Sequence, residues 1–128
     1  MMILRIFNVA MALACLLSAE SAWAHHSIAA VFDQAKRVPL TGTLTKLDWR
    51  NPHIQFFVDV KGDKGQAEPW SIEGSSPNVF KGQKISKTNF ENAIGQTVVL
   101  EANPAKDGSR YGLMVSMTFP DGTVFNRE

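Results

Sequence analysis

Alternation of apolar and polar positions dominates the chain from Val38 onward and predicts β-strands. The clearest run is Ile54, Phe56, Val58 and Val60, whose neighbours are expected to face outward. Strict alternation of this kind is typical of a strand with one buried face. The same pattern predicts four further strands, over residues 40–49, 70–74, 96–102 and 111–119, and a short terminal extension at 124–125.

The segments between these strands carry turn and helix signals. Asn51-Pro52 predicts a turn, because the residue before proline is pushed out of the helical region and proline donates no backbone hydrogen bond. Residues 75–95 lose the alternation and contain two helix starts, at Ser76-Pro77 and at Ser86 to Asn89. The predicted order is three strands, a helical insert, two strands and an extension.

This order predicts an all-β fold with a short helical insert. The interpretation we favour is a small five-stranded Greek-key barrel, OB-like in its connectivity, and the alternative is a small open β-sandwich. The core positions that follow from the alternation are Leu44, Ile54, Phe56, Val58, Trp70, Ile72, Val98, Leu100, Leu113, Val115 and Met117.

The first 24 residues have the pattern of a secretory signal. Arg5 precedes a nearly continuous apolar run over residues 6–17, which is too short to span a bilayer. Ala22-Trp23-Ala24 places small residues where signal peptidase recognises them, so we expect cleavage before His25. Cleavage after Ser21 and an uncleaved anchor remain as alternatives. The predicted organisation is a signal peptide at 1–24, an N-terminal arm at 25–37 and one domain at 38–128, in a periplasmic or secreted protein.

Composition narrows the functional classes for the exported part. The single cysteine of the sequence, Cys15, lies in the signal, so neither a disulfide nor a thiolate site is expected afterwards. Removing Arg5 and Glu20 with the signal leaves 12 basic and 11 acidic side chains. Because this balance is close to neutral, we expect neither nucleic acid nor a membrane surface as partner, and no later apolar run is long enough for a membrane span.

The three histidines of the chain are the main candidates for chemistry. They are His25, His26 and His53, and two of them would begin the exported protein. An N-terminal histidine offers its α-amino nitrogen and its imidazole Nδ1 to one metal ion, and a third nitrogen completes a site suited to Cu(II). We expect His53, which follows the Asn51-Pro52 turn and should point outward, to be the third donor, with His26 as an additional or substitute donor.

Two other side chains are candidates near such a site. Glu73 ends the third predicted strand. It is a candidate fourth metal ligand, or a candidate partner of a side chain that binds the metal. The alternatives are a solvated charge at the strand end and a helix cap. Trp49 is a candidate for a ligand-binding face, with burial as its alternative. The histidines themselves have a simpler interpretation, as a polar chain start and a turn residue.

Motifs of hydrolases and phosphate-binding loops are absent from the sequence, so we expect binding rather than catalysis. The first hypothesis is a periplasmic metal-binding protein, a copper carrier or sensor. The second is a module that binds a periplasmic protein or a small ligand without metal, through Trp49, Phe57 and the loop at 73–78. A copper oxidase or monooxygenase is a third, disfavoured by the short chain.

Several segments spread over the exported part resemble a family of small exported bacterial proteins that is classed as a domain of unknown function. These segments are His25-His26-Ser27, Phe32-Asp33, Leu40-Thr41-Gly42-Thr43, Trp49-Arg50-Asn51-Pro52-His53, Glu73-Gly74-Ser75-Ser76-Pro77, Ala105-Lys106-Asp107-Gly108-Ser109 and Pro120-Asp121-Gly122. The resemblance implies an exported single-domain protein and supplies no reaction. A weaker similarity, confined to His25, is to histidine-brace copper proteins, which include periplasmic copper carriers and lytic polysaccharide monooxygenases.

Overall fold

The computed structural model describes residues 28–127. The chain divides into two units, residues 1–31 and residues 32–128. In the first unit, residues 28–31 form a helical turn, and the predicted signal peptide lies outside the described residues. All the strands among the described residues lie in the second unit.

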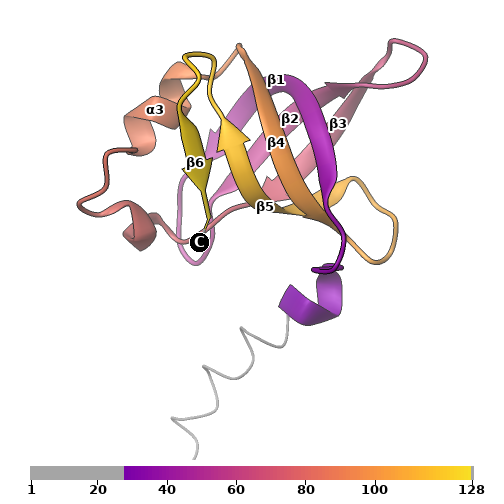
Figure 1. Cartoon of the computed structure of the whole chain (residues 1–128), viewed down its shortest axis with the longest axis horizontal. Helices are drawn as coiled ribbons and strands as arrows, with labels where there is room; N and C mark the ends of the chain where they lie inside the picture. The colour runs from indigo at the N-terminus through magenta and orange to yellow at the C-terminus, as the bar shows by residue number, and fades with distance from the viewer. Residues whose placement is uncertain (1–27, 128) are drawn as a thin grey trace, which may run out of the picture. The chain divides into compact units, whose positions relative to one another are not determined.

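Six strands form one sheet that closes on itself. They are β1 (Val38–Asp48), β2 (Gln55–Lys61), β3 (Ala67–Glu73), β4 (Thr97–Pro104), β5 (Tyr111–Thr118) and β6 (Val124–Asn126). The order across the sheet is β3-β2-β1-β4-β5-β6, and a parallel pairing of β3 with β5 joins the two sides. The result is a closed five-stranded barrel with β6 as an extra edge strand (Figure 1), which confirms the barrel over the sandwich.

The long strand β1 makes closure possible because it pairs with two neighbours. Gly42 lies opposite Val60 of β2 and Val98 of β4, where β1 passes from one side of the barrel to the other. A Cβ at position 42 would collide with the carbonyl oxygen of Asp59 and lie 2.9 Å from a methyl carbon of Val58. Glycine is therefore required for this close approach of two strands.

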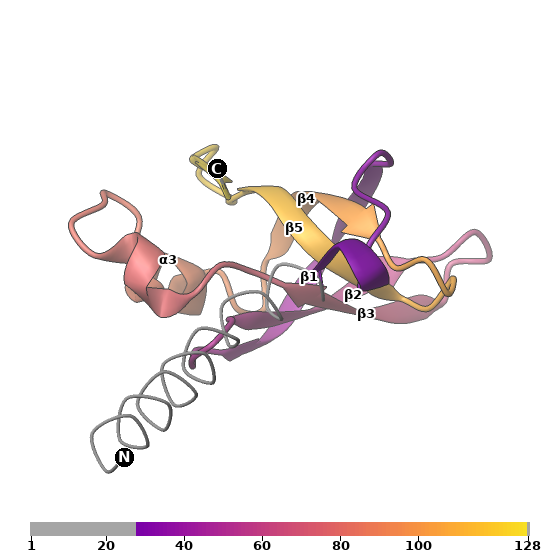
Figure 2. The same ribbon diagram turned by 90° about the horizontal axis from the view of Figure 1, so that it is seen from below.

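The helical insert begins where the sequence predicts. The 3-10 helix η1 spans Pro77–Phe80 and the short helix α3 spans Lys87–Asn92. At the start of α3, the side-chain oxygen of Asn89 accepts hydrogen bonds from the backbone N–H and the hydroxyl of Ser86. Figures 1 and 2 both show the insert at the end of the barrel opposite the β2–β3 and β4–β5 turns.

An aromatic cluster closes that end of the barrel. The ring of Phe90, on α3, is fully buried and lies 5.2 Å from that of Phe56 and 5.0 Å from that of Phe119, measured between centroids. Phe80 of η1 and Phe125 of β6 pack into the same cluster. The insert is thus held to the barrel by burial of apolar surface, which is the main stabilising term in folding.

All the predicted core residues are buried except Trp70 and Val115, which are half-buried. The strand β5 contains a bulge: Ser116 lies opposite Glu101, Met114 lies opposite Ala102, and Val115 between them has no partner. Because one extra residue reverses the alternation, Met114 rather than Val115 faces the core. Trp70 packs against the margin of the core from the β2–β3 hairpin.

The segment before β1 is fixed on the outside of the barrel. Phe32 is buried and forms an isolated bridge with Ala105, and the backbone N–H of Asp33 donates to the carbonyl of Pro104 at 2.9 Å. Part of the predicted N-terminal arm is therefore attached to the barrel. Over residues 28–127, no helix has the length and apolar character needed to cross a membrane.

Candidate functional site

Three strands bring polar side chains together on the outer face of the barrel. Gln55 of β2 lies opposite Glu73 of β3, and Ser71 of β3 lies beside Tyr111 of β5. The intervening residues of these strands, Phe56, Ile72 and Gly112, are buried on the inner face. Since side chains alternate between the two faces of a sheet, Gln55, Ser71, Glu73 and Tyr111 share the outer face.

His53 joins this face from the turn before β2. Its Nδ1 lies 2.8 Å from Oε1 of Glu73, and the exposed fractions of the two side chains are 33% and 12%. A carboxylate that is largely shielded from water is stabilised by polar partners at its oxygens, and His53 supplies one of them. Glu73 is therefore neither a solvated strand-end charge nor a helix cap.

Tyr111 occupies the other oxygen of the same carboxylate. Its phenol donates a hydrogen bond to Oε2 of Glu73. Burial, followed by this bond to a carboxylate, raises the pKa of Tyr111 to about 12, and a hydrogen bond from Gln55 acts in the opposite direction. The phenol consequently stays protonated at neutral pH and continues to donate to Glu73.

Two further contacts support this His53–Glu73–Tyr111 cluster. The ring of Phe32 packs against the ring of Tyr111, with centroids 4.9 Å apart. The hydroxyl of Ser71 donates to Oε1 of Gln55 at 3.2 Å. The cluster is thus held from the N-terminal side of the barrel and from within the sheet.

The arrangement fixes which nitrogen of His53 is available to a ligand. In a neutral imidazole one nitrogen carries the proton and the other a lone pair. When Nδ1–H donates to Glu73, the lone pair is on Nε2, and the side chain is one-third exposed. Histidines that bind metals usually donate their second nitrogen to a carboxylate or a carbonyl in this way. Chemically, the cluster is able to present one oriented nitrogen donor.

The structure brings together two of the predicted site residues, His53 and Glu73. His25 and His26 lie outside the described residues. Trp49 is half-buried and packs against Phe80 and Phe90, with centroid distances of 5.0 and 5.7 Å. Its contacts are those of a packing residue, and a role on a ligand-binding face stays a prediction.

Sequence analysis missed Tyr111 as a site residue. The sequence contains one tyrosine, and the alternation predicts it at the start of a strand, without indicating a role for it. It reaches Glu73 because β3 and β5 pair in parallel, and no local pattern announces a pairing between residues 38 positions apart.

Within the described part of the chain, no group of three or more histidine, cysteine, aspartate or glutamate side chains is placed to hold a metal ion. His53 and Glu73 therefore do not form a complete metal site by themselves. Further donors would have to come from elsewhere.

Comparison with known proteins gives one result for this chain. Residues 12–115 match the family described as "Family of unknown function (DUF6152)". The chain belongs to this family. The DUF6152 match includes His53, Glu73 and Tyr111 and extends into the apolar N-terminal segment. No curated protein and no solved structure matches the chain.

Proposed function

We propose that the protein is exported to the periplasm or secreted and binds Cu(II) through His53, as a copper carrier or sensor. The observation that supports the proposal is the 2.8 Å contact between Nδ1 of His53 and Oε1 of Glu73, a side chain that is 12% exposed. This contact orients the ring and makes Nε2 the donor atom.

The remaining donors in this proposal are the α-amino group and the imidazole of His25, with His26 as an additional or substitute donor. The sequence has three histidines, and its one cysteine precedes the predicted cleavage site. Nitrogen ligation beyond His53 therefore depends on the first two. Phe32, which packs on Tyr111, follows His25 by seven positions, so a short covalent link connects the predicted start of the exported chain to the cluster.

The donor set favours copper over other divalent ions. Three nitrogen donors with an amine-imidazole chelate suit the tetragonal preference of Cu(II), which also forms the most stable complexes among the divalent first-row ions. Glu73 acts in this proposal as a positioning residue that holds the His53 ring, and Tyr111 holds Glu73.

The test is Cu(II) titration of the exported protein, after mass spectrometry has established its N-terminus, followed by electron paramagnetic resonance of the loaded protein. We expect a tight one-to-one site with nitrogen hyperfine structure, altered in His53→Ala. A variant with one glycine added before His25 keeps all three imidazoles but breaks the amine-imidazole chelate, and it should bind more weakly. Circular dichroism of each variant checks that the barrel is folded.

Two results would overturn the proposal. One is a mature N-terminus other than His25 together with unchanged copper affinity in His53→Ala. The other is weak binding that neither variant changes. If copper binds as expected, ascorbate-driven oxidation by the loaded protein separates an enzyme from a carrier, and we expect no turnover.

A second candidate function is a module that binds a protein or a small ligand without metal. One observation favours it: a groove of about 440 Å³ on the outer face of β1, β2 and β3, lined by Phe57, Pro69 and Ser71 among others. The ammonium of Lys46 lies 5.1 Å from the centre of the Phe57 ring at this groove. Absence of copper binding would make this the leading function, and Phe57→Ala would then be the first variant to examine.

A further inference from the structure

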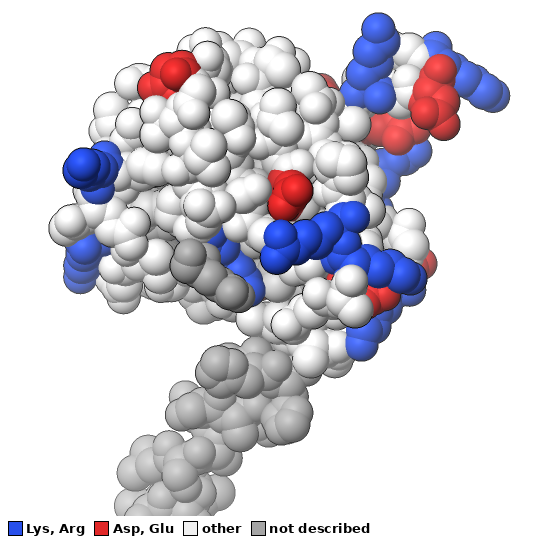
Figure 3. Space-filling model, in the orientation of Figure 1, with Lys and Arg blue, Asp and Glu red and all other residues white. Residues whose placement is uncertain are grey.

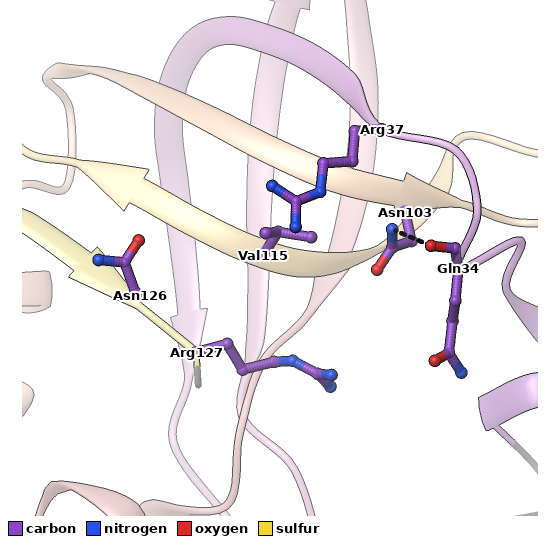
Figure 4. Close-up of a pocket in the computed structure, with 6 residues that line it drawn as sticks. All are labelled: Gln34, Arg37, Asn103, Val115, Asn126 and Arg127. Atoms are coloured by element: carbon purple, nitrogen blue, oxygen red, sulfur yellow. Dashed lines mark hydrogen bonds between the residues drawn. The ribbon is translucent and has the colours of Figure 1, made fainter.

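A second hollow lies on the outer face of β4, β5 and β6, and none of its residues belongs to the His53–Glu73–Tyr111 cluster. Its volume is about 340 Å³, within the size range of small-molecule sites. The residues that line it are Gln34, Arg37, Asn103, Val115, Asn126 and Arg127 (Figure 4). They come from the segment before β1, from the strands β4, β5 and β6, and from Arg127, which follows β6.

The β5 bulge builds the floor and one wall of this hollow. Because Val115 is the unpaired residue of the bulge, its side chain turns away from the core and becomes an apolar floor. Its carbonyl oxygen accepts a hydrogen bond from the backbone N–H of Arg127 at 2.9 Å. The same bulge thus places Arg127 beside the floor.

Asn103 builds the opposite wall. Its side chain is 6% exposed, and its amide nitrogen donates to the carbonyl of Lys36 at 2.7 Å and to that of Gln34 at 3.5 Å. These bonds fix the backbone on both sides of residue 35, and Arg37 follows directly. Figure 4 shows the Arg37 guanidinium next to Val115, with Arg127 extending from the other flank of β5 toward Gln34.

Among the described residues that line the hollow, the charged side chains are basic. They are the two arginines, Arg37 and Arg127, and Asn126 and Gln34 add amide groups. Glu101 stands at the rim, where its carboxylate lies 3.4 Å from Nη1 of Arg37, with 49% of its side chain exposed against 64% for Arg37. Exposed pairs of this kind contribute at most about 1 kcal/mol, so Glu101 competes weakly for Arg37. Figure 3 shows basic side chains beside the start of β1 on this face.

We propose that this hollow binds a small organic dicarboxylate. A guanidinium group recognises a carboxylate through paired hydrogen bonds. Arg37 and Arg127 lie on opposite flanks of β5 (Figure 4), so each is placed to bind one carboxylate of the same ligand. The apolar floor at Val115 matches a carbon chain between them and disfavours a bare inorganic ion. The contact between Glu101 and the Arg37 guanidinium shows that this group is placed to bind a carboxylate. In the proposal, a ligand carboxylate binds Arg37 in place of Glu101.

The experiment uses the protein as the cell produces it from the full-length sequence. Succinate is titrated by calorimetry and by NMR of the Val115 methyl groups, beside succinamide, its neutral counterpart of the same shape, and inorganic phosphate. We expect saturable binding of succinate with shifts at Val115, and none with succinamide. Arg37→Gln and Arg127→Gln should each weaken binding about tenfold, which corresponds to about 1.4 kcal/mol. Glu101→Gln should strengthen it severalfold by removing the competing carboxylate.

Lys84→Gln, in the loop between η1 and α3, removes one positive charge outside the hollow and is the matched control. The proposal is wrong if Lys84→Gln weakens succinate binding as much as the arginine variants, since the effect would then be one of net charge. It is equally wrong if succinate gives no saturable shift, or if phosphate binds at Val115 and succinate does not. Copper binding at His53 is measured separately, so failure of either proposal leaves the other intact.

Discussion

The inner and outer faces of β2 and β3 differ in what their side chains do, although the two faces alternate residue by residue. On the inner face Phe56, Val58 and Ile72 are almost fully buried in the hydrophobic core. On the outer face the side chain of Glu73 is 12% exposed, and its carboxylate contacts polar groups of His53 and Tyr111. One face stabilises the barrel, and the other holds a charged group in a defined position.

This difference has an energetic consequence. Burial of an aliphatic or aromatic side chain stabilises a fold through the removal of apolar surface from water. Burial of a carboxylate costs free energy that its hydrogen bonds offset, so its net contribution to stability is small. The two fixed partners of the Glu73 carboxylate therefore suit the positioning role that we propose for it better than a stabilising one.

The largest effect is expected from a matched pair of substitutions on adjacent residues of β2. Phe56 is fully buried, whereas Phe57 is half-buried on the outer face. We expect Phe56→Ala to lower the free energy of unfolding by about 4 kcal/mol, as for other buried phenylalanines. Phe57→Ala should cost about 1 kcal/mol, since less apolar area is lost. Urea denaturation measures both, and equal losses would contradict the assignment of faces.

The next effect concerns function more than stability. Glu73→Gln keeps the size of the side chain and removes its charge, so the Nδ1–H of His53 has a weaker acceptor. We expect copper affinity to fall by about 10- to 100-fold, as when other carboxylate partners of metal-binding histidines are removed. The free energy of unfolding should change by about 1 kcal/mol or less.

Glu68→Gln is the control for this substitution. Glu68 lies on the same strand and forms an ion pair with Arg110 at 3.3 Å, so its replacement removes the same charge and one charged contact. Copper affinity should be unchanged in this variant. A loss of affinity as large as that of Glu73→Gln would show that net charge, and not the orientation of His53, controls binding.

The smallest expected effect concerns the pKa of the Tyr111 phenol. This pKa can be measured directly, because the sequence contains one tyrosine. Ultraviolet absorbance of the phenolate should give a pKa of about 12, against an ordinary value of 10.0. In Glu73→Gln the pKa should fall but stay above 10.0, because burial is the larger cause of the shift. A wild-type value of 10.0 would mean that the phenol is solvated and does not donate to Glu73.

The same shift predicts how stability depends on pH. The folded protein holds the phenolic proton more tightly than the unfolded chain, so the associated stability is complete below pH 10.0 and is lost as the pH rises toward 12. Relative to Tyr111→Phe, the wild type should therefore lose free energy of unfolding over this range. Urea denaturation at a series of pH values measures the difference between the two proteins.

Local patterns predicted most of the fold because they act over short distances. The alternation around Phe56 places one face of a strand in the core wherever that strand lies, and Ser86 and Asn89 cap α3 with neighbouring atoms. The prediction for Val115 was wrong because a bulge inserts one residue, and the pairing between β4 and β5 determines where the bulge occurs.

For the candidate site too, local sequence patterns predicted one part and long-range contacts decided the rest. By itself, the sequence determined the order of strands, the outward direction of His53 and the candidate status of Glu73, since each depends on alternation and turn chemistry within a few residues. Only the tertiary structure decided that Glu73 lies between His53 and Tyr111 and that Arg37 and Arg127 flank Val115. These contacts join residues far apart in the chain, and closure of the barrel by β3 and β5, with the register it imposes, brings them together.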